Sequence, residues 1–247
     1  MDANERSSRG VSAAAPVLTV AGLHAFYGES HVLHGINFEI RKGEVVALLG
    51  RNGAGKTSTL RAIMGLISAT GSIRFGDTEL VSRTPEGIAR LGIGYVPEER
   101  GIFASLSVEE NLFLPPVIKP GGMDIAEIYA LFPNLSDRRK SQGTKLSGGE
   151  QQMLAIARIL RTGADLILLD EPTEGLAPVI VEEIGKAVQL LIAKRFTVLL
   201  VEQNLDFARS VSDRYYVIEE GHVIDQILAA QISEPGTVDK LNTYLGV

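Results

Sequence analysis

One stretch of the sequence decides the fold: Gly50-Arg51-Asn52-Gly53-Ala54-Gly55-Lys56-Thr57. Its spacing, G-x-x-x-x-G-K-[ST], is that of a phosphate-binding P-loop. The apolar run 45–49 before it predicts a buried strand, and the segment 58–64 after it predicts a helix. Glycines let the backbone turn its N–H groups onto phosphate oxygens, and the start of a helix adds partial positive charge. We expect these residues and Ser58 to hold a nucleotide, with Lys56 on its β- and γ-phosphates and Thr57 on Mg²⁺.

A glycine-rich turn that binds nothing is the alternative for this stretch. We do not favour it, because strand, loop and helix follow one another in the order that the motif requires.

Composition limits the class of protein. The 247 residues allow one large domain, and a hydrophobic share of 45% is enough for a sizeable core. No apolar run approaches the roughly 18 residues that cross a bilayer. The net charge of −6 argues against nonspecific nucleic-acid binding, and the absence of cysteine suits a reducing cytoplasm. The histidines at positions 24, 31, 34 and 222 show no metal-site clustering in the sequence.

The sequence divides into a short tail and one folded domain. We expect residues 1–16 to be disordered and residues 17–247 to fold together as an α/β domain with an antiparallel β subdomain. The prolines and glycines between residues 98 and 160 predict an inserted α-helical subdomain. Strands are predicted at 18–20, 36–40, 72–75, 94–96, 165–170, 197–201, 215–218 and 223–227, and helices at 85–91, 151–160, 179–195 and 204–210. The segment from residue 229 is too short for a regulatory domain.

A second motif follows the strand predicted at 165–170, which ends in two carboxylates. Buried parallel strands place their last residues at the sheet edge where ligands bind. Asp170 is therefore expected to hold Mg²⁺ through water, and Glu171 to polarise the attacking water. Two solvated acids are the alternative, which the P-loop makes less favoured.

A third motif, Leu146-Ser147-Gly148-Gly149-Glu150, opens the helix predicted at 151–160. Ser-Gly-Gly leaves free N–H groups at a helix start, which form an anion site. With this motif the chain resembles the ATP-binding cassette (ABC) family, and the resemblance extends from about Leu18 to Gly246. It implies that the α/β domain has the P-loop NTPase core of that family. The resemblance implies a head-to-tail dimer, in which Ser147, Gly148 and Gly149 contact a γ-phosphate held by the partner's Lys56. It also implies that Tyr27 stacks on adenine; the alternative is an ordinary tyrosine near a hairpin turn.

At three places the sequence differs from the general pattern of the family, and these differences point to one branch of it. Glu98 replaces a glutamine that contacts the Mg²⁺ water and the γ-phosphate, and Gln203 replaces a histidine that hydrogen-bonds the γ-phosphate. The segment 174–178 lacks the usual aspartate. Together these residues resemble the second ATPase subunit of branched-chain amino acid importers and the related urea and amide importers. The matching segments are Pro97-Glu98, Glu171-Pro172, 175–178, 201–204, 149–157 and Tyr244-Leu245-Gly246.

The resemblance implies an ATPase that uses ATP and Mg²⁺ to power an importer, most simply of branched-chain amino acids. Its partners would be a homologous ATPase subunit (or a second copy in vitro), two permease subunits and, indirectly, a soluble binding protein, with no nucleic acid. Its place would be peripheral, on the cytoplasmic face of the inner membrane. The alternatives are a urea or short-chain amide importer, a soluble ABC ATPase that acts on DNA or ribosomes, and a regulator that no longer hydrolyses ATP.

The segment Arg100-Gly101-Ile102-Phe103 is expected to line the groove that receives a permease helix. An apolar Phe103 beside charged neighbours suits an anchor for a partner. The alternative is that Phe103 packs inside the core of the helical subdomain.

Overall fold

The computed structural model describes residues 15–246. Most of the predicted tail lies outside the described residues. Its last residue, Pro16, already belongs to strand β1 (Pro16–Tyr27).

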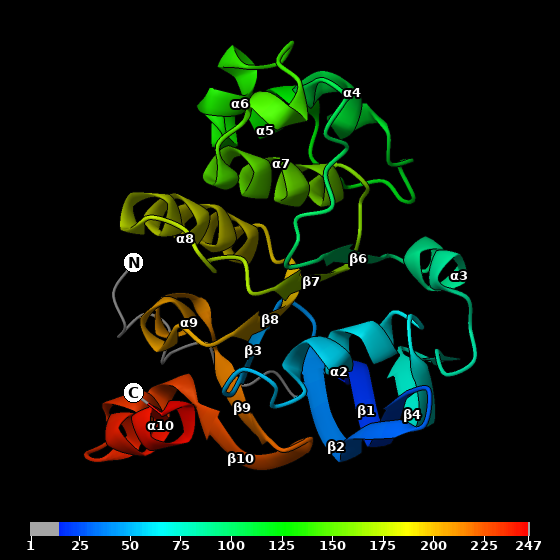
Figure 1. The fold of residues 1–247 in the computed structure, drawn as a ribbon, viewed down its shortest axis with the longest axis vertical. Coiled ribbons are helices and arrows are strands. Elements are labelled where there is room, and N and C mark those ends of the chain that lie inside the picture. The colour runs from blue at the N-terminus through cyan, green and yellow to red at the C-terminus, as the bar shows by residue number, and fades with distance from the viewer. Residues whose placement is uncertain (1–14, 247) are drawn as a thin grey trace.

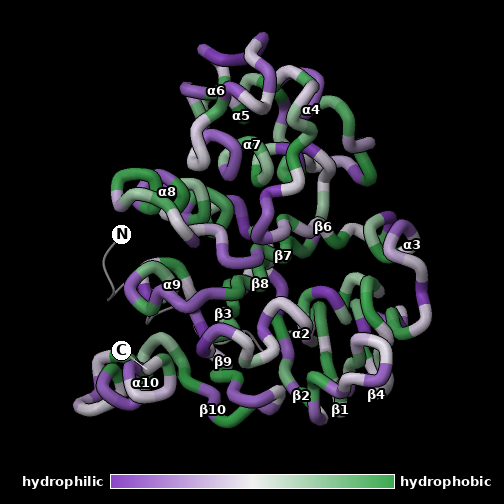
Figure 2. The backbone as a smooth tube through the Cα atoms, viewed as in Figure 1, coloured by the Kyte–Doolittle hydropathy of each residue, from purple (hydrophilic) through white to green (hydrophobic). Residues whose placement is uncertain are grey.

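The central layer is a six-stranded sheet in the order β10-β9-β3-β8-β7-β6. The strands are β3 (Val45–Leu49), β6 (Ile93–Val96), β7 (Leu166–Asp170), β8 (Thr197–Glu202), β9 (Arg214–Glu219) and β10 (His222–Leu228). All neighbours pair in parallel except β9 and β10. Every residue of β3, β7 and β8 is buried, which explains their continuous apolar runs (Figure 2).

A separate antiparallel sheet has the order β2-β1-β4-β5. It contains β1, β2 (Ser30–Arg41), β4 (Ser68–Phe75) and the short β5 (Thr78–Glu79). The strands β1 and β2 are longer than the sequence predicted. Register shifts along their pairing break the strict alternation of apolar and polar residues, so the pattern shows only part of each strand.

The helices fall into two groups in Figure 1. Beside the sheets lie α2 (Lys56–Ile63), α3 (Pro85–Arg90), α8 (Pro178–Ala193), α9 (Leu205–Val211) and α10 (Thr237–Leu245). At the top lie α4 (Val108–Phe113), α5 (Ile125–Leu131), α6 (Pro133–Asp137) and α7 (Gly148–Leu160). Helix α10 lies in a segment for which the sequence pattern predicts no element, and its buried Leu241 and Leu245 pack with Tyr215 of β9.

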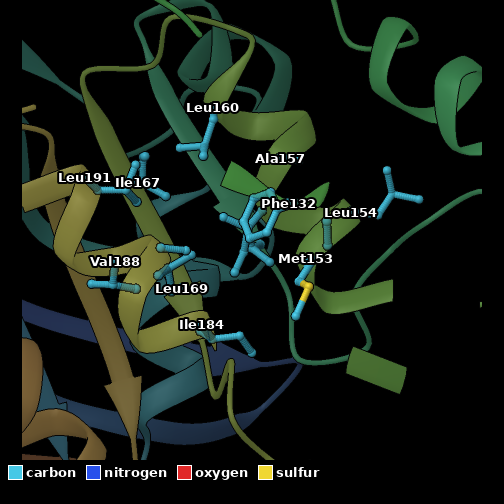
Figure 3. Packing of buried hydrophobic residues seen from close by; sticks show 14 of the residues in the cluster. Phe132, Met153, Leu154, Ala157, Leu160, Ile167, Leu169, Ile184, Val188 and Leu191 are labelled. Atoms are coloured by element: carbon cyan, nitrogen blue, oxygen red, sulfur yellow. The ribbon is translucent and has the colours of Figure 1, made fainter. Parts of the chain in front are cut away.

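One apolar cluster joins the upper helices to the central sheet (Figure 3). Met153 and Ala157 of α7 belong to it together with Leu169 of β7 and Val188 of α8. The start of α7 also packs closely on α8, since a Cβ added at Gly149 would lie 2.5 Å from Cγ2 of Ile180. The helix that carries the third motif therefore shares an apolar core with β7, the strand that ends at Asp170 directly before Glu171.

Candidate nucleotide site

The P-loop connects β3 to α2 and forms a cradle of backbone N–H groups. Gly53 and Gly55 adopt positive φ angles of 82° and 109°, which glycine reaches without steric cost. No side chain among residues 15–246 caps the start of α2, so the N–H groups of its first turn remain available. At Gly55 the φ angle favours glycine, and an added Cβ would also lie 2.7 Å from Cδ2 of Leu33. The loop has the backbone that an anion site requires.

Lys56 folds back across the loop. Its Nζ donates hydrogen bonds to the carbonyls of Gly50 (2.8 Å) and Arg51 (3.1 Å) and lies 3.1 Å from Oε1 of Glu171. The lysine side chain is only 3% exposed and that of Glu171 only 10%. The P-loop cation and the carboxylate after β7, which are far apart in the sequence, therefore form one buried ion pair.

Asp170 accepts two hydrogen bonds from opposite sides. The hydroxyl of Thr57 donates to Oδ1 and that of Tyr95 to Oδ2, each over 2.9 Å. Burial raises the pKa of Asp170, against the lowering effect of these hydrogen bonds. It also raises the pKa of the Tyr95 hydroxyl, so the phenol stays protonated and donates. Sequence reasoning missed Tyr95, although its place near the end of β6, the neighbour of β7, is a usable signal.

The oxygens of Thr57 and Asp170 fit a magnesium ion in part. Mg²⁺ prefers hard oxygen ligands, and here a hydroxyl and a carboxylate are already in contact. Within residues 15–246, no group of three or more His, Asp or Glu residues is arranged to hold a metal. A cation at this position would therefore need phosphate oxygens and water for its remaining ligands.

Negative charge accumulates along the edge of the sheet. Glu98 follows β6, and partial burial raises the pKa of its carboxyl, as do the charges of Glu171 and Asp170. Gln203 follows β8 and is half-buried. The strands β3, β8, β7 and β6 are consecutive in the sheet and parallel, so their carboxyl ends bring the P-loop and these polar residues to one edge.

Tyr27 lies at the end of β1 beside the first turns of α2. Its hydroxyl is 3.5 Å from Oγ of Ser58 and accepts a hydrogen bond from Nη1 of Arg61 over 3.4 Å. The tyrosine is 40% exposed, so part of it is accessible to a ligand. Arg61, which sequence reasoning did not single out, also pairs with Glu99 at 3.5 Å.

The third motif begins helix α7 with a capping box. Oγ of Ser147 accepts from the N–H of Glu150 (3.3 Å), and Oε2 of Glu150 accepts from the N–H of Ser147 (2.8 Å). The guanidinium of Arg100 covers Gly148 and donates to Gln151 over 3.2 Å. In Figure 1 α7 lies well apart from α2, so Ser147, Gly148 and Gly149 do not join the P-loop within one chain.

Phe103 lies at the surface rather than in the core of the upper helices. It is 45% exposed, and the guanidinium of Arg158 lies over its ring, 4.9 Å from the centroid. Its backbone N–H donates to Oδ1 of the buried Asn111 over 2.8 Å. The alternative that Phe103 packs inside the helical core is therefore wrong.

Spacing in the sequence did not reveal that the four histidines meet. Nδ1 of His24 lies 3.0 Å from Nε2 of His31, and the ring of His34 is 4.1 Å from that of His31 and 5.1 Å from that of His222. Antiparallel pairing sets His24 opposite His34, and the β9–β10 turn packs on β2. Burial and the neighbouring histidines lower the pKa of His34.

Comparison with known proteins agrees with this geometry. A family model described as ABC transporter matches residues 33–174, more than half of the chain. The chain belongs to the ABC transporter family. The high-affinity branched-chain amino acid transport ATP-binding protein BraG of Pseudomonas aeruginosa is 39% identical over 235 residues, 93% of this chain and 100% of BraG. The probable branched-chain amino acid transport ATP-binding protein LivF of Archaeoglobus fulgidus is 36% identical, and the match covers 91% of this chain and 98% of LivF.

Other members of the ABC transporter family share the architecture. The lipopolysaccharide export ATP-binding protein LptB of Escherichia coli is 33% identical, with 93% of this chain and 97% of LptB covered. A solved ATP-binding subunit of an ABC transporter has a TM-score of 0.77 and 28% identity, with 94% and 100% of the two chains covered. The predicted fold class is confirmed, and the chain is an ABC ATPase that works with membrane permease partners.

Proposed function

We propose that this ABC ATPase powers an importer of branched-chain amino acids. For ATP hydrolysis, the observation that carries the proposal is the meeting of Lys56, Thr57, Asp170 and Glu171 at one edge of the sheet. The names of the relatives BraG and LivF support the substrate class. The relative LptB belongs to a lipopolysaccharide export system, so a transport assay is needed to determine the direction of transport and the transported substrate. A urea or short-chain amide importer is the alternative cargo class, and no observation favours it.

The P-loop residues 50–57 and the first turn of α2, including Ser58, bind the phosphates in this proposal. Lys56 leaves Glu171 and the loop carbonyls and places its charge on the β- and γ-phosphates. Tyr27 stacks its exposed face on the adenine. Thr57, Asp170 and Glu98 hold Mg²⁺, which supplies charge neutralisation at the phosphates when bound.

In this proposal, residues at the edge of the sheet carry out the hydrolysis of ATP. Once Lys56 has moved, the carboxylate of Glu171 is free to orient water and to accept its proton. The Gln203 amide donates a hydrogen bond toward the γ-phosphate and, unlike a histidine, carries no titration near neutral pH. These roles explain why both residues lie at the ends of neighbouring strands.

A second cassette completes the site. Ser147, Gly148 and Gly149 lie apart from the P-loop of their own chain, so they would meet the γ-phosphate of a partner. We propose a homologous ATPase subunit as the native partner, with two permease subunits, an indirect binding protein and no nucleic acid. Sedimentation of Glu171→Gln with and without ATP tests the pairing; a strict monomer with ATP and each candidate partner would contradict it.

We further propose that residues 17–247 act as one domain, in which residues 98–160 move as a helical unit during the ATP cycle. Within residues 15–246, no helix is both long and apolar enough to cross a bilayer. Contact with the membrane through permeases would place the ATPase at the cytoplasmic face of the inner membrane.

Phosphate release by the purified chain tests the proposal. Hydrolysis should require Mg²⁺, and Lys56→Ala should abolish it, because the fixed cation opposite the phosphates is lost. The matched control is Lys119→Ala, which removes an exposed lysine that pairs with Asp165. Uptake of leucine or of urea by vesicles with the permeases then decides the cargo. Hydrolysis by Lys56→Ala at the rate of the parent would refute the proposed site.

A further inference from the structure

Glu202, the last residue of β8, carries a buried carboxylate that the proposed reaction does not use. It is 2% exposed. Its strand lies between β3, which leads into the P-loop, and β7, which ends at Asp170. Burial raises the pKa of Glu202 to about 7, and the charge of Glu171 adds to this rise. An acid at this position costs free energy, so its hydrogen bonds must compensate for its burial.

The hydrogen bonds of Glu202 reach two segments of the site. Oε1 accepts from the hydroxyl (2.8 Å) and the N–H (3.3 Å) of Thr173, and Oε2 accepts from the N–H of Asn204 over 3.2 Å. Thr173 lies two residues after Glu171, and Asn204 directly follows Gln203. One carboxylate thus ties together the loops that carry the proposed base and the proposed γ-phosphate donor.

The backbone of Glu171 shows why such a tie is needed. Its φ is +43°, in the left-handed region that non-glycine residues rarely adopt. Such a conformation persists where surrounding contacts determine it. Here the N–H of Glu171 donates to Val201 (3.0 Å), and its carbonyl accepts from the N–H of Glu174 (3.1 Å). Thr173 lies inside this turn. Among the hydrogen bonds of residues 15–246, only those between Thr173 and Glu202 connect the middle of the turn to β8.

We propose that Glu202 is a positioning residue: through Thr173 and the backbone of Asn204 it holds Glu171 and Gln203 in the geometry that hydrolysis requires. The inference rests on the proposed roles of Glu171 and Gln203. Displacement of a reacting group by about 1 Å can slow a reaction by roughly 10²-fold. Loss of the tie is therefore expected to act on turnover, whereas nucleotide binding by the P-loop persists.

Thr173→Val tests this directly, because it removes the hydroxyl and nearly preserves the shape. We expect kcat to fall about tenfold or more, with KM for ATP within about twofold of the parent. Thr173→Ser restores the hydroxyl and should bring kcat back to within about threefold. The matched control is Thr197→Val at the opposite end of β8, where a 2% exposed Thr197 accepts a hydrogen bond from the N–H of Gly43 over 3.0 Å. It should lower Tm and leave kcat unchanged.

Glu202→Gln provides a second arm if Thr173→Val does not fold. The amide keeps one acceptor oxygen, so it can accept from the N–H of Thr173 or from the N–H of Asn204, but not from both. We expect a folded protein, by circular dichroism, with reduced kcat and unchanged KM. An unchanged kcat in the folded variants overturns the inference, as does an equal loss in Thr197→Val. Glu171→Gln in the same assay separates the two proposals: if it is inactive while Thr173→Val is fully active, only the positioning inference fails.

Discussion

Glu171→Gln tests the base and the ion pair together. In the absence of nucleotide, Glu171 is one of three acceptors for the buried Nζ of Lys56, beside the carbonyls of Gly50 and Arg51. The amide removes the charge but keeps an oxygen. Because two carbonyls remain, we expect a loss of about 1–3 kcal/mol in the free energy of unfolding, rather than the larger cost of an orphaned charge. For a chain of this size, each kcal/mol corresponds to roughly 2–4 °C in Tm.

The same substitution should strengthen nucleotide binding. Lys56 leaves Glu171 when it moves to the phosphates, so the nucleotide-bound state does not lose the contact. The difference of about 1–3 kcal/mol appears as a nucleotide affinity that is tighter by roughly 5- to 150-fold. Hydrolysis should fall by about 10²- to 10⁴-fold, because the water loses its base.

Three measurements check this prediction: single-turnover phosphate release, thermal unfolding with and without a non-hydrolysable ATP analogue, and equilibrium binding of that analogue. The control is Glu174→Gln, which makes the same charge change at an exposed position in the same turn. Unchanged turnover in Glu171→Gln would refute the base. If the analogue binds Glu171→Gln no more tightly than the parent and does not restore its Tm, then Lys56 does not leave Glu171 when nucleotide binds.

Three further results are expected. Phe103→Ala should leave basal hydrolysis near normal but uncouple it from uptake in reconstituted transporters, because its exposed ring is available to a permease; normal uptake would place the anchor elsewhere. Gln203→Ala should slow turnover, and Gln203→His should stay active and gain a pH dependence near 6.5; an Ala variant as fast as the parent would exclude the residue. The folded pKa of Glu202, about 7, exceeds its ordinary value of 4.5, so its stability contribution is full below pH 4.5 and is lost as the pH rises through 7. The Tm of Glu202→Gln relative to the parent should therefore rise between pH 5 and 8, and a constant difference would contradict the shift.

Local sequence patterns are enough to predict the features that depend on neighbours along the chain. P-loop spacing, the apolar strand that ends at Asp170 and the capping box at Ser147 are local patterns, because a turn, a buried strand and a helix start each need particular residues within a few positions. Parallel strands gather their carboxyl ends, so the meeting of Lys56, Asp170 and Glu171 was also predictable in outline.

Contacts between side chains of distant segments follow from the folded structure and could not be predicted from these local patterns. The pairing of Tyr95 with Asp170, the contacts of Glu202 with Thr173 and the meeting of the four histidines join residues of different strands. Helix α10 forms because Leu241 and Leu245 have an apolar surface of the sheet to cover. Such contacts depend on strand register and on packing between segments that are far apart in the sequence. The pattern of apolar residues within one segment does not indicate which distant segment will pack against it.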